Sequence, residues 1–241
     1  MRLITKKTKM KAEEYVKKMD DKVDEFLKEF KALPSDYFFT EKEIHAYFYH
    51  KCLSDPVFFD GKSFNYVHAE YPTPFKCRKS KDKLIKAPDI ENHAMRSHVD
   101  MVFINPNFVT WIKKKSKDDY IKYLNGITGQ VFSVYIKDLV EKFEEFYNRF
   151  KEPVLIYAIE FKYFRHRSSG KESPVTDVKY DVSKLKLLQN PEFESLQTKF
   201  PFSAKTLSIV LFTRNMNGLK VEIEKKLKGT EKYMRIAMCS V

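Results

Sequence analysis

Residues 153–164, PVLIYAIEFKYF, have the hydrophobic pattern of a strand that is covered on both faces. Eight of the first ten are non-polar or aromatic, and the exceptions are Glu160 and Lys162. Because side chains alternate along a strand, these two share a face and lie about 6–7 Å apart. Ionisable groups beside a core are usually paired, bound to metal or catalytic, so this pair is the first candidate for chemistry.

A salt bridge at a solvated strand end would also explain Glu160 and Lys162. The E-x-K pattern by itself carries no information, because EFK at residues 29–31 and EKK at residues 224–226 repeat it in helical contexts. Only the apolar strand ahead of Glu160 makes it unusual. Other parts of the sequence are therefore needed to distinguish a catalytic pair from a salt bridge.

Other stretches predict further strands at residues 63–71, 96–106, 207–212 and 232–241. The first is expected to stop at Tyr71-Pro72, before a solvated basic loop at residues 76–86, and a turn is expected at residues 60–62. In RSHVDMVFINP, residues 96–106, Asp100 enters a strand whose neighbours are apolar. It is a second carboxylate that is costly to bury.

Apolar residues at intervals of three and four predict helices at residues 7–32, from residue 40 onward, and at 109–151, 177–189 and 218–227. Thr40 and Glu43 fit a capping box, and capping alone would account for that glutamate. Asn125-Gly126 is expected to divide the segment at 109–151 into two helices.

This order of elements predicts an α/β protein of the α+β type, with a mixed central sheet flanked by helices. We expect one domain over residues 1–241. It comprises an N-terminal amphipathic helix at 1–33, an α/β core at 34–110 and 151–241, and an inserted helical hairpin at 111–150. The N-terminal helix is expected to pack on the core, with dimerisation as the alternative.

The composition indicates a globular protein with an anionic partner. Of the 241 residues 43% are hydrophobic and 15% aromatic, and the formal net charge is +12. Such a charge favours nucleic acid or an anionic surface, although a lysine-rich composition can also reflect a high working temperature. Cys52, Cys77 and Cys239 form no CxxC pair, and His45 and His50 fit no zinc spacing.

The N-terminal segment lacks an apolar signal-peptide core, and no run is long enough for a membrane span. We therefore expect a cytoplasmic protein without a membrane partner.

If the strands of Asp100 and Glu160 are neighbours, the two carboxylates meet beside Lys162, and a divalent cation best explains them. Oxygen ligands suit Mg²⁺ or Mn²⁺, which activates water and polarises a phosphoryl oxygen.

With Asp100 in RSHVDMVF, Glu160 and Lys162 in VLIYAIEFKYF, and this order of elements, the chain resembles the PD-(D/E)xK nuclease superfamily, the restriction-endonuclease-like phosphodiesterases. The resemblance covers about residues 37–105 and 153–238. It implies that Asp100 and Glu160 bind the metal and that Lys162 is catalytic. It further implies Glu43 as the upstream helical glutamate and Glu70 as an additional acid, and an insertion at 111–150.

The expected function is a Mg²⁺- or Mn²⁺-dependent nuclease, with DNA favoured over RNA and endonuclease activity favoured. Candidate nucleic-acid contacts are Arg96, Arg165, Arg167, Lys171, Lys184 and Gln189. One alternative is a nucleic-acid-binding protein that keeps the fold but does not cut. Another is a helical interaction module built on residues 7–32 and 111–150. A homodimer would be compatible with the nuclease, because cutting a duplex benefits from two-fold symmetry.

Overall fold

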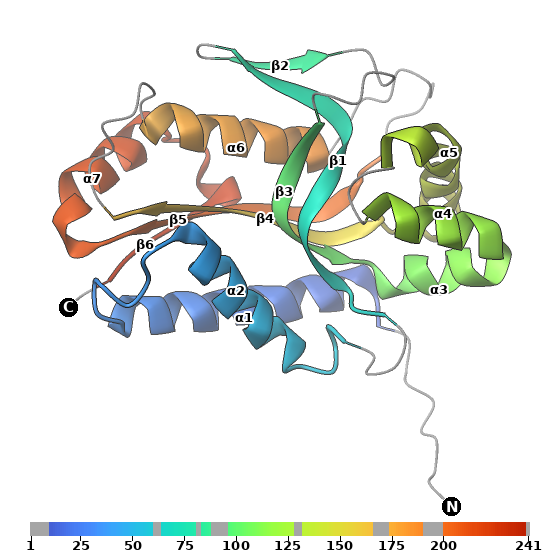
Figure 1. The fold of residues 1–241 in the computed structure, drawn as a ribbon, viewed down its shortest axis with the longest axis horizontal. Coiled ribbons are helices and arrows are strands. Elements are labelled where there is room, and N and C mark those ends of the chain that lie inside the picture. Colours follow the sequence, from blue (N-terminus) through green and yellow to red (C-terminus); the bar gives the residue numbers. More distant parts are fainter. Residues whose placement is uncertain are drawn as a thin grey trace, which may run out of the picture.

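A mixed β-sheet forms the centre of the molecule (Figure 1). The computed structural model describes residues 10–59, 64–80, 83–87, 96–127, 132–165, 174–189 and 200–239. Within them the strand order is β2-β1-β3-β4-β5-β6. The strands are β1 (Val67–Ser80), β2 (Lys83–Ala87), β3 (Arg96–Ile104), β4 (Leu155–Phe164), β5 (Ser203–Phe212) and β6 (Met234–Met238). The predicted α/β class with a mixed sheet is confirmed.

The strand directions divide the sheet at β4. Strands β2, β1, β3 and β4 pair antiparallel, whereas β4, β5 and β6 pair parallel. Helix α6 (Pro174–Gln189) connects β4 to β5, and α7 (Asn217–Lys226) lies between β5 and β6. These crossovers are what parallel neighbours require. Strand β4 is therefore central, with β3 on one side and β5 on the other.

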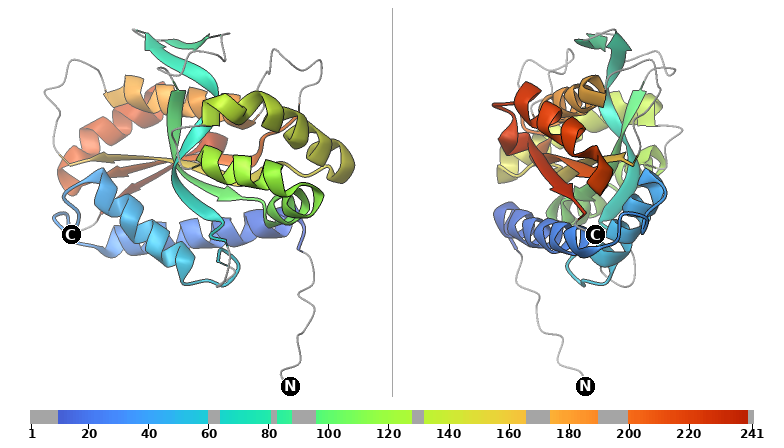
Figure 2. Two further views of the ribbon diagram at one scale, coloured as in Figure 1. Left: turned by 45° about the vertical axis from the view of Figure 1, so that its right-hand side comes forward. Right: turned by 90° about the vertical axis from the view of Figure 1, so that its left-hand side faces the viewer.

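Helices cover both faces of the sheet (Figures 1 and 2). Helices α1 (Ala12–Ala32) and α2 (Glu41–Leu53) lie on one face, and α6 and α7 on the other. Alternating residues of β5 show the division. Leu207, Ile209 and Leu211 pack in the cluster of α1 and α2, while Val210 and Phe212 pack with α6 and α7. Among the described helices, none is long and apolar enough to cross a membrane.

Strand β1 corrects two expectations. It does not stop at Tyr71-Pro72 but continues to Ser80, and it pairs there with β2, so the segment at 76–86 contains a strand pair rather than only a loop. A register shift between Pro72 and Lys76 interrupts the pairing with β3, which accommodates a residue without a backbone N–H. Lysines suit such an edge because charge discourages pairing with other chains. The turn predicted at 60–62 lies outside the described residues.

The inserted segment contains three helices instead of a hairpin: α3 (Pro106–Lys115), α4 (Lys117–Ile127) and α5 (Phe132–Phe150). The Asn105 side chain accepts a hydrogen bond from the Asn107 amide at 2.9 Å and starts α3. The predicted division at Asn125-Gly126 is wrong, because both residues lie inside α4. The first observed break is at Ser116, whose hydroxyl accepts from the Asp119 amide at 3.1 Å, and the second falls between the end of α4 at Ile127 and the start of α5 at Phe132.

Candidate functional site

Strands β3 and β4 separate where their charged residues begin. Their ladder pairs Met101 with Ile159, and continuing this register places Asp100 opposite Glu160. Directly opposed residues of antiparallel strands point to the same face of a sheet. Asp100 Oδ2 accepts a hydrogen bond from the Phe161 amide at 2.7 Å, so the carboxylate holds the strand where backbone pairing has ended.

Helix α6 places two further charged residues over β4. Lys184 Nζ lies 2.6 Å from Glu160 Oε1, and Lys162 Nζ lies 3.4 Å from Asp181 Oδ2. Lys184 also donates to the His98 carbonyl at 2.8 Å. Glu160, Asp181 and Lys184 are all buried, so β4 and α6 are joined by two ion pairs that water screens poorly. Asp181 and Lys184 are three residues apart and therefore lie on one side of the helix.

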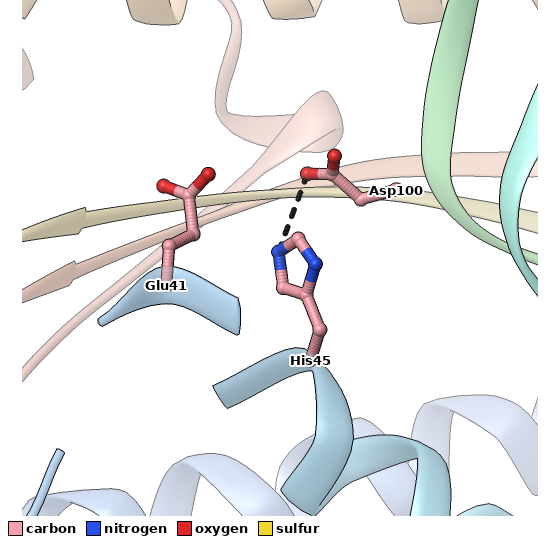
Figure 3. Close-up of side chains that lie close together, drawn as sticks. All are labelled: Glu41, His45 and Asp100. Atoms are coloured by element: carbon pink, nitrogen blue, oxygen red, sulfur yellow. Dashed lines mark ion pairs between the residues drawn. The ribbon is translucent and has the colours of Figure 1, made fainter. Parts of the chain in front are cut away.

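Helix α2 contributes Glu41 and His45 from the other face of the sheet (Figure 3). Glu41 Oε2 accepts from the Tyr163 amide at 3.0 Å, and Oε1 lies 3.7 Å from Lys162 Nζ. His45 Nε2 lies 3.6 Å from Asp100 Oδ2. One ligand atom each from Glu41, His45 and Asp100 lies within 4.8 Å of the other two. We call these three residues the acid–imidazole trio.

The sequence prediction missed Glu41, His45 and Asp181. Glu41 and His45 are four residues apart on α2, which places them on one helical face. That spacing was visible in the sequence, but it acquires meaning only because α2 brings this face to the point where β3 and β4 separate. Asp181 likewise depends on the position of α6 over β4.

Burial and negative charge dominate the electrostatics of the site. Burial raises the pKa of Glu160 well above its usual range, against the effect of Lys184, and Asp100 adds to the rise. Burial also raises the pKa of Glu41 and of Asp181, with Lys162 opposing both shifts. A raised pKa means that burial disfavours the anionic form of a carboxylate, and a further cation nearby would stabilise that form.

The two lysines respond in the opposite direction. Burial lowers the pKa of Lys162, but the surrounding carboxylates, Asp181 and Glu41 first among them, outweigh burial and raise it overall. The pKa of Lys184 is raised in the same way, chiefly by Glu160 against burial. Both lysines therefore stay protonated at neutral pH. Burial lowers the pKa of His45, so its imidazole is neutral there and has a lone pair to offer.

The donor set fits a divalent cation. The four acids Glu41, Asp100, Glu160 and Asp181 stand against two lysines, which leaves a formal charge of −4 + 2 = −2 for these described side chains. The buried Nε2 of His45 has no hydrogen-bond partner among the described residues. A neutral imidazole nitrogen and two carboxylates around one point are the donors that first-row divalent cations use in proteins.

Two predicted acids occupy other positions. Glu43 completes the predicted capping box: its amide donates to Thr40 Oγ1 at 3.3 Å, and its carboxylate accepts from the Thr40 amide at 3.1 Å. It is exposed and committed to the cap, so the α2 glutamate that faces Asp100 is Glu41. Glu70 is exposed and has a φ of 54°, a conformation that non-glycine residues rarely adopt. It occupies the β1 position opposite Asp100, between the pairs Ala69–Met101 and Tyr71–Val99.

The predicted nucleic-acid contacts are scattered. Lys184 lies within the site, and Arg165 stacks over the ring of Phe39 at 4.5 Å from its centroid. The Gln189 side chain donates to the Ala204 carbonyl at 3.5 Å. Arg96 starts β3, and nothing further is described of its side chain. Arg167 and Lys171 lie outside the described residues.

Comparison with models of known protein families, with curated proteins and with solved structures gave no match for this chain.

Proposed function

We propose that this protein is a metal-dependent nuclease that hydrolyses phosphodiester bonds, with DNA as the favoured substrate. One observation carries the proposal. Asp100 and Glu160 oppose each other where two central strands separate, and Lys162 follows on the same face. Helix α2, strands β1 and β3, strand β4 with Glu160 and Lys162, helix α6 and the parallel strand β5 follow the order that the resemblance implies, with β2 and helices α3–α5 as additional elements.

The acid–imidazole trio is the best candidate for the metal ligands. Glu160, expected as a ligand, does not belong to this trio, and its Oε1 lies 2.6 Å from Lys184 Nζ. A bound divalent cation would lower the pKa of a water molecule and polarise a phosphoryl oxygen. Because one of the three donors is an imidazole nitrogen, the trio favours Mn²⁺ over Mg²⁺, which binds almost entirely through oxygen.

Lys162 supplies positive charge to the reacting phosphate. Its raised pKa keeps it protonated at neutral pH, so it cannot serve as a general base. Asp181 and Glu41 hold its ammonium group at 3.4 and 3.7 Å. A fixed ammonium group can stabilise the negative charge that grows on the phosphoryl oxygens during hydrolysis.

The proposal is tested by calorimetric titration of Mn²⁺ and Mg²⁺ into the protein, with nicking of supercoiled plasmid measured in parallel. The wild type is compared with Asp100→Asn and with Asp20→Asn, a carboxylate of α1 that pairs with Lys205 instead. We expect Asp100→Asn to lose both metal binding and at least about 100-fold in rate, and Asp20→Asn to keep both. Chelation with EDTA should stop nicking, and re-addition of Mn²⁺ should restore it. A wild type that takes up neither metal and leaves the plasmid intact would refute the proposal.

A nucleic-acid-binding protein without catalysis is the second candidate. The 2.6 Å contact between Lys184 and Glu160 favours it, because an internal lysine already neutralises one of the two acids that the reaction would need. In that case the same titration shows no metal uptake, while a labelled oligonucleotide still binds.

A further inference from the structure

Two exposed aromatic residues lie beside the candidate site. The described part of the chain contains few exposed large hydrophobic side chains: Tyr37, Phe39, Phe59, Ile121 and Val221. Tyr37 and Phe39 are 50% and 62% exposed and belong to the same short connection between α1 and α2. Glu41 of the acid–imidazole trio follows Phe39 by two residues. The most exposed aromatic ring of the described chain is therefore close to the proposed metal site.

The connection that carries these rings is held on both sides. Between them Phe38 is buried, and its ring stacks on Phe30 with a centroid distance of 6.3 Å. The Tyr163 hydroxyl donates to the Phe38 carbonyl at 3.0 Å, and the Phe39 amide donates to Glu43 Oε2 at 2.6 Å. The carboxylate that caps α2 thus also positions Phe39. Exposed rings on a fixed backbone lose little conformational entropy when a ligand covers them.

Arg165 adds positive charge at the same place. Its guanidinium lies 4.5 Å from the centroid of the Phe39 ring, and the residue directly follows β4, three positions after Lys162. The contact between Glu41 and the Tyr163 amide joins the start of α2 to the end of β4. The exposed ring and the guanidinium therefore lie where the start of α2, which carries Glu41 of the acid–imidazole trio, meets the end of β4.

We propose that Phe39, flanked by Tyr37, stacks against an unpaired base of the substrate strand while Arg165 contacts a phosphate of the same strand. The inference rests on the proposed nuclease function and specifies its substrate class as single-stranded or locally unpaired nucleic acid. Aromatic rings next to cationic groups bind single strands in this way, because every base has a face that can stack. In a duplex both faces of a base are already covered by its neighbours.

The test is the fluorescence anisotropy of labelled oligonucleotides in EDTA, where no cleavage occurs. Three probes are compared: a single strand of about ten thymidines, an abasic strand of equal length and charge, and a duplex of equal length. Phe39→Ala is the test variant. Phe59→Ala is the matched control, because Phe59 is also an exposed aromatic residue, at 40%, beyond the other end of α2.

We expect the wild type to bind the thymidine strand about tenfold more tightly than the abasic strand. Phe39→Ala should remove that difference, and Phe59→Ala should retain it. Arg165→Gln should weaken binding of both the thymidine strand and the abasic strand, because both carry the phosphates that Arg165 contacts. Equal affinities of the wild type and Phe39→Ala for the thymidine strand would overturn the inference.

The outcome is separable from that of the nuclease proposal. If Phe39 makes the protein bind the thymidine strand more tightly than the abasic strand but the protein never cuts DNA, the stacking site stands and the nuclease proposal is refuted. If the protein cuts DNA but Phe39→Ala leaves its affinity for the thymidine strand unchanged, the nuclease proposal stands and the stacking site is refuted. If both hold, Phe39→Ala should raise KM for a single-stranded substrate and leave kcat nearly unchanged, because stacking acts on binding.

Discussion

Strands β4 and β5 carry charged clusters on both faces of the sheet, and the two differ in balance. Toward α1, Asp20 Oδ1 accepts from Lys205 Nζ at 2.6 Å and from the Tyr157 hydroxyl at 2.8 Å. We call these three residues the tether cluster. Toward α6, Glu160 and Lys162 join a group of four acids and two lysines. The tether cluster pairs one acid with one lysine, whereas the candidate site has four acids for two lysines.

The difference between the two clusters distinguishes an ion pair that only stabilises the fold from a candidate metal-binding site. In the tether cluster one carboxylate oxygen meets a cation and a hydroxyl, and the Asp20 and Lys205 side chains are about one-third and one-quarter exposed. In the candidate site Glu160, Asp181 and Lys184 are buried, and the acids outnumber the lysines, an arrangement that is costly to bury. Carboxylates with perturbed pKa values cluster at ligand-binding and catalytic sites.

The largest expected effect is on catalysis, when a lysine is replaced by methionine in each cluster. Lys162→Met should lower kcat for plasmid nicking by about 10²–10³-fold, because the positive charge on the reacting phosphate is lost while the stem is kept. Lys205→Met should leave kcat unchanged. Initial rates in Mn²⁺ measure both. Equal rates for the two variants would mean that Lys162 is an ordinary ion-pair partner.

The next effect is on stability. Lys184→Met leaves Glu160, which is 2% exposed, without its cation, and we expect the free energy of unfolding to fall by about 3–5 kcal/mol. Lys205→Met should cost about 1 kcal/mol or less, because its partner is more exposed and better screened. Urea unfolding measures both.

A double variant controls for lost packing. Glu160→Gln combined with Lys184→Met removes both charges and should recover most of the stability lost in Lys184→Met. If the double variant is as unstable as the single variant, the loss came from packing and not from an unpaired charge.

Parts of this arrangement could be predicted because they follow from local patterns. The apolar run before Glu160 predicts β4, the alternation around Asp100 predicts β3, and Thr40 with Glu43 predicts the start of α2. Each of these elements is present at the expected place. The prediction that Asp100 and Glu160 lie close together followed from the assumption that their strands are neighbours in the sheet.

The remainder depends on tertiary placement. The capping box drew attention to Glu43, although the residue that faces the strands is Glu41, two positions earlier, and only the docking of α2 decides between them. Strand β1 extends through a lysine-rich segment without a hydrophobic pattern, because an edge pair is held by backbone hydrogen bonds. Non-local pairing of this kind leaves little local signal.

A comparison of two histidines gives the smallest expected effect. His45 and His68 each have a buried Nε2 without a hydrogen-bond partner among the described residues. His45 faces Asp100, whereas the His68 ring packs on Phe64 with a centroid distance of 5.4 Å. Burial lowers the pKa of His68, and a backbone hydrogen bond with Asn65 acts in the opposite direction. His68 is therefore expected to be a neutral, partly buried residue.

A lowered folded-state pKa sets the sign of the pH dependence. Above the unfolded-state pKa of about 6.5, His68 is neutral in both states and its contribution to stability is complete. Below it the unfolded chain binds a proton that the folded chain does not, so stability falls as the pH falls toward the folded-state pKa. The Tm of the wild type should thus drop more than that of His68→Gln between about pH 7.5 and pH 5. The other titrating groups are common to both proteins and cancel in the difference, so parallel Tm curves would show that His68 is not held neutral by burial.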